Sequence, residues 1–162
     1  MDDVDRILAQ WQVARPDLDV WAMGPLGRLG RVSSALARRM EQTFARHGLN
    51  AAGFDVLATL RRTPPHALTA GELMAAMMIT SGTVTNRIDQ LAKAGLVERQ
   101  GDETDGRRVV IRLTDEGQAL IERAIVDHVA TQTELLAGLD AEELAGLDAA
   151  LRKLMAGLET GA

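Results

Sequence analysis

The chain has 162 residues, of which 46% are hydrophobic and none is cysteine, so one domain with a sizeable core can form while disulfides, thiolate metal sites and cysteine nucleophiles are excluded. Its net charge of −5 argues against a nucleic-acid partner at first sight. The charge is unevenly distributed, however. The net charge is −3 over residues 1–25 (2 basic and 5 acidic residues), +5 over residues 26–113 (13 basic and 8 acidic) and −7 over residues 114–162 (3 basic and 10 acidic).

Aliphatic residues abound and aromatic residues are scarce, which favours helices packed through aliphatic side chains. No stretch approaches the roughly 20 apolar residues of a membrane span, and the acidic N-terminus leads into no apolar run. We therefore expect a mostly helical, cytoplasmic protein without membrane contact. Its first predicted element is a short helix over residues 5–14, which Pro16 ends and which carries three large apolar residues on one side: Ile7, Leu8 and Trp11.

Two longer amphipathic helices follow this N-terminal arm. The first covers about residues 26–47 and ends at Gly48; its apolar residues recur at steps of three or four: Leu29, Val32, Leu36, Met40 and Phe44. The second covers residues 51–62, because the pair Pro64-Pro65 forbids its continuation.

Two short helices are predicted next. Thr69 and Glu72 form a capping-box pattern, which indicates a helix through about Met77. The segment over residues 80–91 begins with capping residues and directs three apolar side chains inward: Val84, Ile88 and Leu91. Its outward face carries hydroxyl, amide and guanidinium groups: Ser81, Thr83, Thr85, Asn86 and Arg87.

After Gly95 the period of the pattern changes from helix to strand. Residues 96–100 and 109–113 are β-prone and flank a charged turn, which predicts a β-hairpin with one face of its second strand formed by Val109, Ile111 and Leu113. From Thr114 the chain is helical again, and Asp140 caps a last helix with a leucine stripe: Leu144, Leu147, Leu151, Leu154 and Leu158. The predicted fold is mostly α with a small β-hairpin wing.

Two short helices followed by a hairpin form a winged helix-turn-helix, whose second helix enters a major groove while the hairpin reaches the flanking minor groove. Asn86 and Arg87 can pair with base edges there. At the hairpin tip, Arg107 and Arg108 suit a narrow, electronegative minor groove, and Asp105 can orient Arg107 through a charge-assisted hydrogen bond. For each segment taken alone, a solvated polar surface remains the alternative.

The stretch from Gly27 to Gly117 resembles the MarR family in three motifs: Thr-Asn-Arg-Ile-Asp-Gln-Leu, Ala-Gly-Leu-Val-Glu-Arg, and Asp105-x-Arg107 with the later Leu-Thr-Asp-Glu-Gly. The resemblance implies a homodimeric transcription regulator that binds double-stranded DNA at a pseudo-palindromic operator. We expect this regulator to be a repressor. It divides the chain into an arm and a MarR-type domain, with these bounds: arm 1–25, domain 26–162, winged helix-turn-helix core about 51–113, and dimerisation helices about 26–47 and 114–158.

Within that family the chain is most similar to the urate-responsive branch, through Trp11, Arg-Pro-Asp-Leu-Asp, Phe-Asp-Val-Leu-Ala-Thr-Leu-Arg-Arg and Thr-Ser-Gly. The resemblance implies a ligand pocket formed by Trp11, Asp55, Arg87 and Arg99. Two guanidiniums suit a planar anion, an indole covers its face, and a carboxylate responds to its charge. We expect a small anionic effector, urate or another purine. The alternative is a structural ion pair between Asp55 and Arg87 with Trp11 as an apolar anchor.

An enzyme is the main rival class. The three histidines, His47, His66 and His128, lie far apart in sequence, no two have metal-ligand spacing, and there is no glycine-rich phosphate loop. We therefore expect no catalytic site, metal or cofactor, and interpret the histidines as surface or capping residues. A helical protein–protein interaction module without DNA binding is the other alternative, against which Arg107 and Arg108 argue.

Overall fold

The computed structural model of the chain describes residues 1–77, 82–101 and 109–160, with the side chains of residues 82 and 83 left out of the description. Its described part is mostly helical with a small antiparallel sheet, which confirms the predicted fold class. The chain divides into two compact units, residues 1–51 and residues 52–162. None of the described helices combines the length and the apolar character that a membrane span requires.

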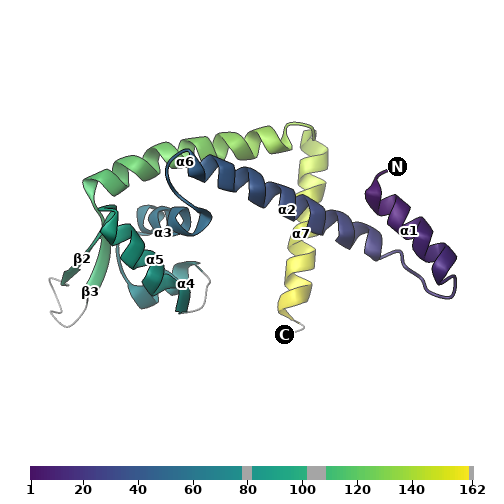
Figure 1. The fold of residues 1–162 in the computed structure, drawn as a ribbon, viewed down its shortest axis with the longest axis horizontal. Helices are drawn as coiled ribbons and strands as arrows, with labels where there is room; N and C mark the ends of the chain where they lie inside the picture. Colours follow the sequence, from purple (N-terminus) through teal and green to yellow (C-terminus); the bar gives the residue numbers. More distant parts are fainter. Residues whose placement is uncertain (78–81, 102–108, 161–162) are drawn as a thin grey trace. The chain divides into compact units, whose positions relative to one another are not determined.

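The first unit contains α1 (Asp3–Ala14) and α2 (Met23–Ala45), drawn in purple and dark blue in Figure 1. α1 begins two residues earlier than predicted because Asp2 and Asp5 form a capping box. The Asp2 carboxylate accepts from the Asp5 backbone N–H at 2.9 Å, and the Asp5 carboxylate accepts from the Asp2 N–H at 2.8 Å. The apolar periodicity alone could not indicate this start.

α1 packs on α2 over a seam of small residues. Val4 is buried, and a Cβ added at Gly27 would lie 3.5 Å from its side chain, while a Cβ at Gly24 would lie 3.3 Å from Leu8 Cδ1. The predicted apolar side of α1 is therefore only partly correct. Of its three members, Leu8 faces the seam, whereas the other two are exposed: Ile7 at 45% and Trp11 at 41%.

Ion pairs border this seam. Arg28 pairs with Asp2 at 2.8 Å and also with Asp5, and Arg31 pairs with Asp3 at 2.6 Å. All these side chains are well exposed, so each pair contributes little alone. All three pairs join the N-terminal end of α1 to α2.

The described part of the second unit contains the three-stranded sheet and five helices. In chain order its elements are α3 (Ala51–Arg62, with Ala51 in the first unit), β1 (Ala67–Thr69), α4 (Ala70–Met77), α5 (Gly82–Lys93), β2 (Val97–Gly101), β3 (Val109–Leu113), α6 (Asp115–Leu136) and α7 (Ala141–Glu159). The antiparallel sheet has the order β1-β3-β2, so β3 is its central strand. The predicted hairpin is present as β2 and β3. The added strand β1 was missed because three residues are too few to show a period.

The core of this unit is formed by large side chains of α3, α4, α5 and α6 together with side chains of the sheet. Its fully buried members include Leu57 and Leu60 of α3, Leu73 of α4, Val84 and Ile88 of α5, and Ile121 of α6. The predicted face of β3 that carries Val109, Ile111 and Leu113 is not buried along its whole length: Val109 is 54% exposed, while the adjacent Val110 and Ile111 are both buried. Adjacent strand residues point to opposite faces, so both faces of the central strand are covered at this point.

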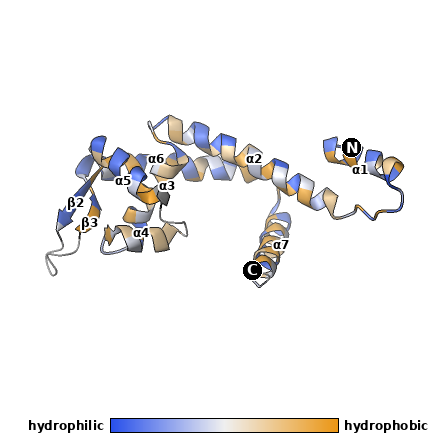
Figure 2. Ribbon diagram, turned by 60° about the horizontal axis from the view of Figure 1, so that its bottom comes forward, coloured by the Kyte–Doolittle hydropathy of each residue, from blue (hydrophilic) through white to orange (hydrophobic). Residues whose placement is uncertain are grey.

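The two C-terminal helices begin where their caps predict. The Thr114 hydroxyl accepts from the Gly117 backbone N–H at 3.0 Å, and Asp140 accepts from the N–H groups of Glu142 and Glu143, each at 2.9 Å. α7 has no buried residue, and apolar residues recur along it in Figure 2. The leucine stripe predicted from the sequence therefore remains partly exposed in the single chain.

Candidate nucleic-acid interface

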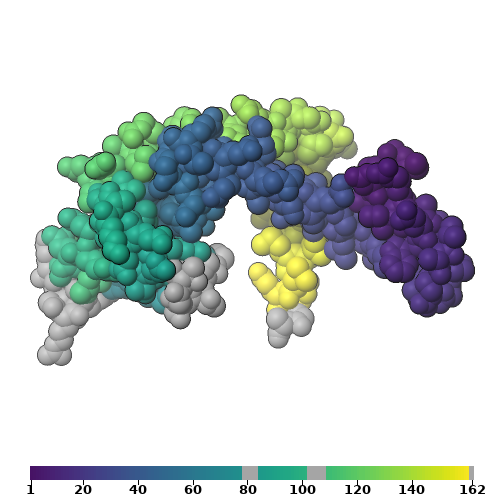
Figure 3. Space-filling view, in the orientation of Figure 1, coloured from purple at the N-terminus to yellow at the C-terminus, as the bar shows by residue number. Residues whose placement is uncertain are grey.

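α5 presents a polar face to solvent because its apolar face is anchored. Val84, Ile88 and Leu91 are buried as predicted, and the helix packs against α4 and β2. Thr85 and Asn86 are exposed in the first turns of the helix. In the space-filling view, α5 lies in teal at the surface of its unit (Figure 3). These two side chains are therefore accessible to a ligand as large as duplex DNA.

Several of the predicted DNA contacts fall outside the described residues. These are Ser81 before α5 and the hairpin-tip residues Asp105, Arg107 and Arg108, together with the side chain of Thr83. Their DNA contacts stay predictions, as do those of Thr85, Asn86 and Arg87.

The sheet contacts both helices of the α4–α5 pair through its two edge strands. β1, which leads directly into α4, pairs with β3 through Leu68 and Ile111. On the other edge, the Arg99 guanidinium of β2 pairs with the carboxylate of Asp89 on α5. The capping box predicted at the start of α4 is also present, since the Thr69 backbone N–H donates to the Glu72 carboxylate at 2.8 Å. Wing and helices therefore form one connected surface.

Asp55 lies on α3 beside three cationic or titratable side chains. Partial burial raises the pKa of its carboxyl, and the charges of Arg87, Arg62 and His128 oppose this rise. Two of the four predicted ligand residues, Asp55 of α3 and Arg87 of α5, therefore interact electrostatically. The structure adds Arg62 and His128, which the sequence reading did not select.

His128 is neither a surface nor a capping histidine, which corrects that prediction. Its half-buried ring packs on Phe54 with centroids 4.8 Å apart and an interplanar angle of 39°. Burial lowers the pKa of its imidazole, and the Asp55 charge opposes this shift. The signal was in the spacing: Ile121, Ala124 and Thr131 are buried, and position 128 continues that inward series. For His66 a capping role fits, since its Nδ1 lies 3.3 Å from the Leu60 carbonyl oxygen.

The remaining two predicted ligand residues have these positions. Arg99 is held by its ion pair with Asp89, and Trp11 belongs to the unit of residues 1–51 and is 41% exposed. The four-residue pocket therefore stays a prediction. Across the described ranges, no group of three or more histidine or acidic side chains could hold a metal ion.

We compared the chain with known protein families and proteins. The model of the MarR family matches residues 47–108, a stretch that contains α3, β1, α4, α5 and β2 and ends just before β3. The transcriptional regulator PecS of Dickeya dadantii is 41% identical over 153 residues, which cover 94% of this chain and 92% of that protein. The chain belongs to the MarR family.

Two further MarR-family relatives bear on activity. MarR of Escherichia coli is 32% identical over 134 residues, covering 81% of this chain and 91% of that protein. The structure of an E. coli MarR mutant in complex with operator DNA is 30% identical, with a TM-score of 0.71 and coverage of 85% and 99%. The chain is thus a DNA-binding transcriptional regulator of this family. Its relatives are named as regulators rather than enzymes, in agreement with the absence of a predicted catalytic site.

Proposed function

We propose that the chain is a homodimeric repressor that leaves a pseudo-palindromic operator when a small anion, urate or a related purine, binds beside α5. The observation that carries this proposal is the electrostatic interaction between Asp55 of α3 and Arg87 of α5. A site that includes a side chain of the DNA-reading helix can couple ligand binding to DNA affinity directly. As a precedent for such ligands, the relative BpsR of Bordetella bronchiseptica, 28% identical with a TM-score of 0.69 and coverage of 80% and 91%, is described as regulated in DNA binding by 6-hydroxynicotinic acid.

The charges around Asp55 support an anionic ligand. Arg87 and Arg62 supply two guanidiniums near one carboxylate, and His128 adds a titratable ring. Guanidiniums form paired, charge-assisted hydrogen bonds with planar anions. Arg99 and Trp11 complete the site in this proposal, the first as a further guanidinium and the second as an aromatic cover.

Release follows from the opposite responses of these groups to an added negative charge. The anion attracts Arg87 and is repelled by Asp55, so α3 and α5 shift relative to each other. Since the shifted arrangement holds the anion more tightly and DNA less tightly, ligand and operator compete through the conformation of the protein.

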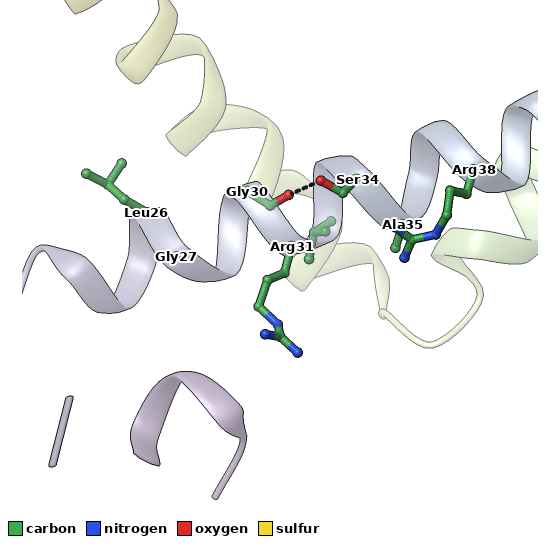
Figure 4. A pocket seen from close by; sticks show the side chains of 8 residues that line it. Leu26, Gly27, Gly30, Arg31, Ser34, Ala35 and Arg38 are labelled. Carbon is green, nitrogen blue, oxygen red and sulfur yellow. Dashed lines mark hydrogen bonds between the residues drawn. The ribbon is translucent and has the colours of Figure 1, made fainter. Parts of the chain in front are cut away.

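The dimer is supported by apolar helix faces that the chain leaves uncovered. Four residues of α2 are exposed along one stripe: Leu26, Leu29, Val32 and Leu36. Figure 4 shows a groove along this helix, with Leu26 and Ala35 on its wall and the Ser34 hydroxyl turned back to the Gly30 carbonyl at 2.9 Å. α7 leaves Leu147, Leu154 and Leu158 exposed. A second copy of the chain can bury these faces and present two α5 helices about one helical turn of DNA apart.

The experiment is a titration of the wild type and two variants with operator DNA by fluorescence anisotropy. Urate, xanthine and a small tricarboxylate are added in turn, and sedimentation velocity gives the oligomeric state. Urate is expected to weaken operator binding of the wild type and of Asp148→Asn, a surface control on α7, by about tenfold or more. Asp55→Asn is expected to reduce this response. Operator affinity that all three compounds leave unchanged would contradict the proposed ligand class.

A further inference from the structure

We propose that Arg62 carries the ligand signal to the helix-turn-helix: without ligand it caps the end of α4, and an anion beside Asp55 draws its guanidinium away from that helix. This inference rests on the proposed function, because it needs an anion at the Asp55–Arg87 site. It assigns a positioning role to a residue that the expected pocket does not contain.

The first observation is a hydrogen bond between helices. Arg62 is the last residue of α3, and its Nη2 donates to the Ala76 carbonyl oxygen at 3.1 Å. α4 ends at Met77, so this carbonyl is one of the last four of the helix, which have no partner within it. A cationic donor at a helix C-terminus satisfies such a carbonyl and also interacts favourably with the helix dipole. Arg62 therefore stabilises the end of α4.

The second observation is that the same guanidinium lies within the field of Asp55. The two residues are seven positions apart on α3, so they lie on one face, two turns from each other. The positive charge of Arg62 favours the ionised form of Asp55, as does that of Arg87. Arg62 thus interacts with Asp55 of the candidate anion site and with the end of α4.

A bound anion would compete for this guanidinium. Carboxylate-like or urate oxygens accept charge-assisted hydrogen bonds that are stronger than those to a neutral backbone carbonyl. When Arg62 turns to the anion, the Ala76 carbonyl loses its donor and the last turn of α4 is weakened. α4 packs directly against α5, so the change reaches the helix that reads DNA.

The adjacent arginine provides a matched control. Arg61 has the same charge and also lies in the last turn of α3, but its guanidinium pairs with Glu122 of α6. Arg61→Gln therefore removes one positive charge from the same turn without removing the donor to Ala76.

The test compares the wild type, Arg62→Gln, Arg62→Lys and Arg61→Gln as full-length protein. The measured quantity is coupling, the ratio of operator Kd at saturating urate to operator Kd without urate. Amide hydrogen exchange of α4 without ligand is measured in parallel. We expect Arg62→Gln to reduce the coupling about fivefold or more and to speed exchange at the end of α4. Arg62→Lys should restore part of both effects, and Arg61→Gln should match the wild type.

Two results would overturn the inference. One is equal coupling in Arg62→Gln and Arg61→Gln with urate still releasing the wild type from DNA, which leaves the proposed function intact. The other is unchanged exchange at the end of α4 in Arg62→Gln, because Arg62 would then not hold that helix. A wild type that binds operator but does not respond to urate would instead contradict the proposed function.

Discussion

Asp55 is a carboxylate whose surroundings act on it in opposite directions. Burial against neighbouring side chains disfavours its charge, and Arg87, Arg62 and His128 favour it, with burial the larger effect. Its pKa in the folded chain is consequently raised above the ordinary aspartate value. A group held in this way contributes to stability when protonated and not when ionised. A carboxyl group whose pKa is raised by burial beside charged side chains is a candidate functional residue.

A stability measurement distinguishes a functional role of Asp55 from a structural ion pair. The contribution of a raised pKa is fully present below the unfolded-state value of 3.8 and is lost as the pH rises through the folded-state value. Asp55→Asn should therefore raise the melting temperature at pH 7, and the difference from the wild type should vanish near pH 3. Thermal unfolding followed by circular dichroism tests this. A lower melting temperature of the variant at pH 7 would indicate a structural ion pair with Arg87.

His128 has the opposite dependence on pH. Its pKa is lowered by burial, so the folded chain prefers the neutral ring, and this contribution is present above the unfolded-state value of 6.5 and is lost as the pH falls. His128→Phe keeps an aromatic ring against Phe54 and cannot be protonated. We expect the free energy of unfolding of this variant to fall less between pH 7 and pH 5 than that of the wild type or of His47→Gln. Equal slopes in all three proteins would refute this.

Among the elements, the junction of the wing with α6 depends on a glycine. A Cβ at Gly117 would overlap the Leu96 carbonyl oxygen. That oxygen accepts the Thr114 backbone N–H at 3.2 Å, and the Thr114 hydroxyl donates to the Gly95 carbonyl at 2.6 Å. This close approach explains physically why glycine ends the Leu-Thr-Asp-Glu-Gly motif. A larger residue must move either the start of α6 or the end of the loop before β2.

Two glycine substitutions test this packing. Gly117→Ala should destabilise the chain by about 1–3 kcal/mol or more, because the backbone has to shift. Gly146→Ala, in the exposed face of α7 with nothing within 4 Å of the added Cβ, should stabilise it by roughly 0.5–1 kcal/mol through helix propensity. Urea unfolding measures both. Equal effects of the two substitutions would show that the junction is not tightly packed.

The docking of α1 is also an element-scale property. The pKa of Asp2 is lowered to about 2 by its hydrogen bonds with Arg28 and the Asp5 backbone, so its ionised form is the paired one. Its contribution is present above pH 3.8 and is lost as the pH falls through about 2. Arg28→Ala should speed amide exchange throughout α1 at neutral pH, whereas Arg6→Ala, which removes only a pair with Asp3 within α1, should not. Unchanged exchange in Arg28→Ala would mean that Val4 and Leu8 hold α1 alone.

The sequence predicted those elements that local chemistry determines. The caps at Thr69, Thr114 and Asp140 and the stop at Pro64-Pro65 all act within four residues, and the helices begin or end there. The sequence of β1 does not indicate a strand, because these three residues are extended only through their pairing with β3.

The residues of the candidate ligand site are predicted less completely from the sequence. Asp55 and Arg87 are predicted through family resemblance, and their charges interact in the structure. Arg62 and His128 were missed because their roles depend on contacts with α4 and with Phe54, which become visible only when the helices are packed. Arg99 pairs with Asp89, a contact that the sequence does not predict, and its place in the ligand pocket stays a prediction. A guanidinium takes whichever carboxylate the fold places within its reach, and sequence spacing does not determine that choice.

For the whole molecule, the proposed functions can be assigned to the two units. The unit of residues 52–162 carries the candidate DNA surface and the Asp55–Arg87 pair, while α2 in the first unit and α7 in the second leave apolar stripes for a second copy. The net charge of −5 does not prevent DNA binding, because the positive balance lies in residues 26–113. The bounds of arm, domain and dimerisation helices drawn from the sequence remain predictions.

A footprint of the full-length protein on the DNA that flanks its own gene, with and without urate, tests the ligand-released dimer most directly. We predict two protected half-sites centred about one helical turn apart, and loss of both together when urate is added. Protection that persists unchanged at saturating urate would contradict release by the anion, and a single, asymmetric protected site would contradict the dimer.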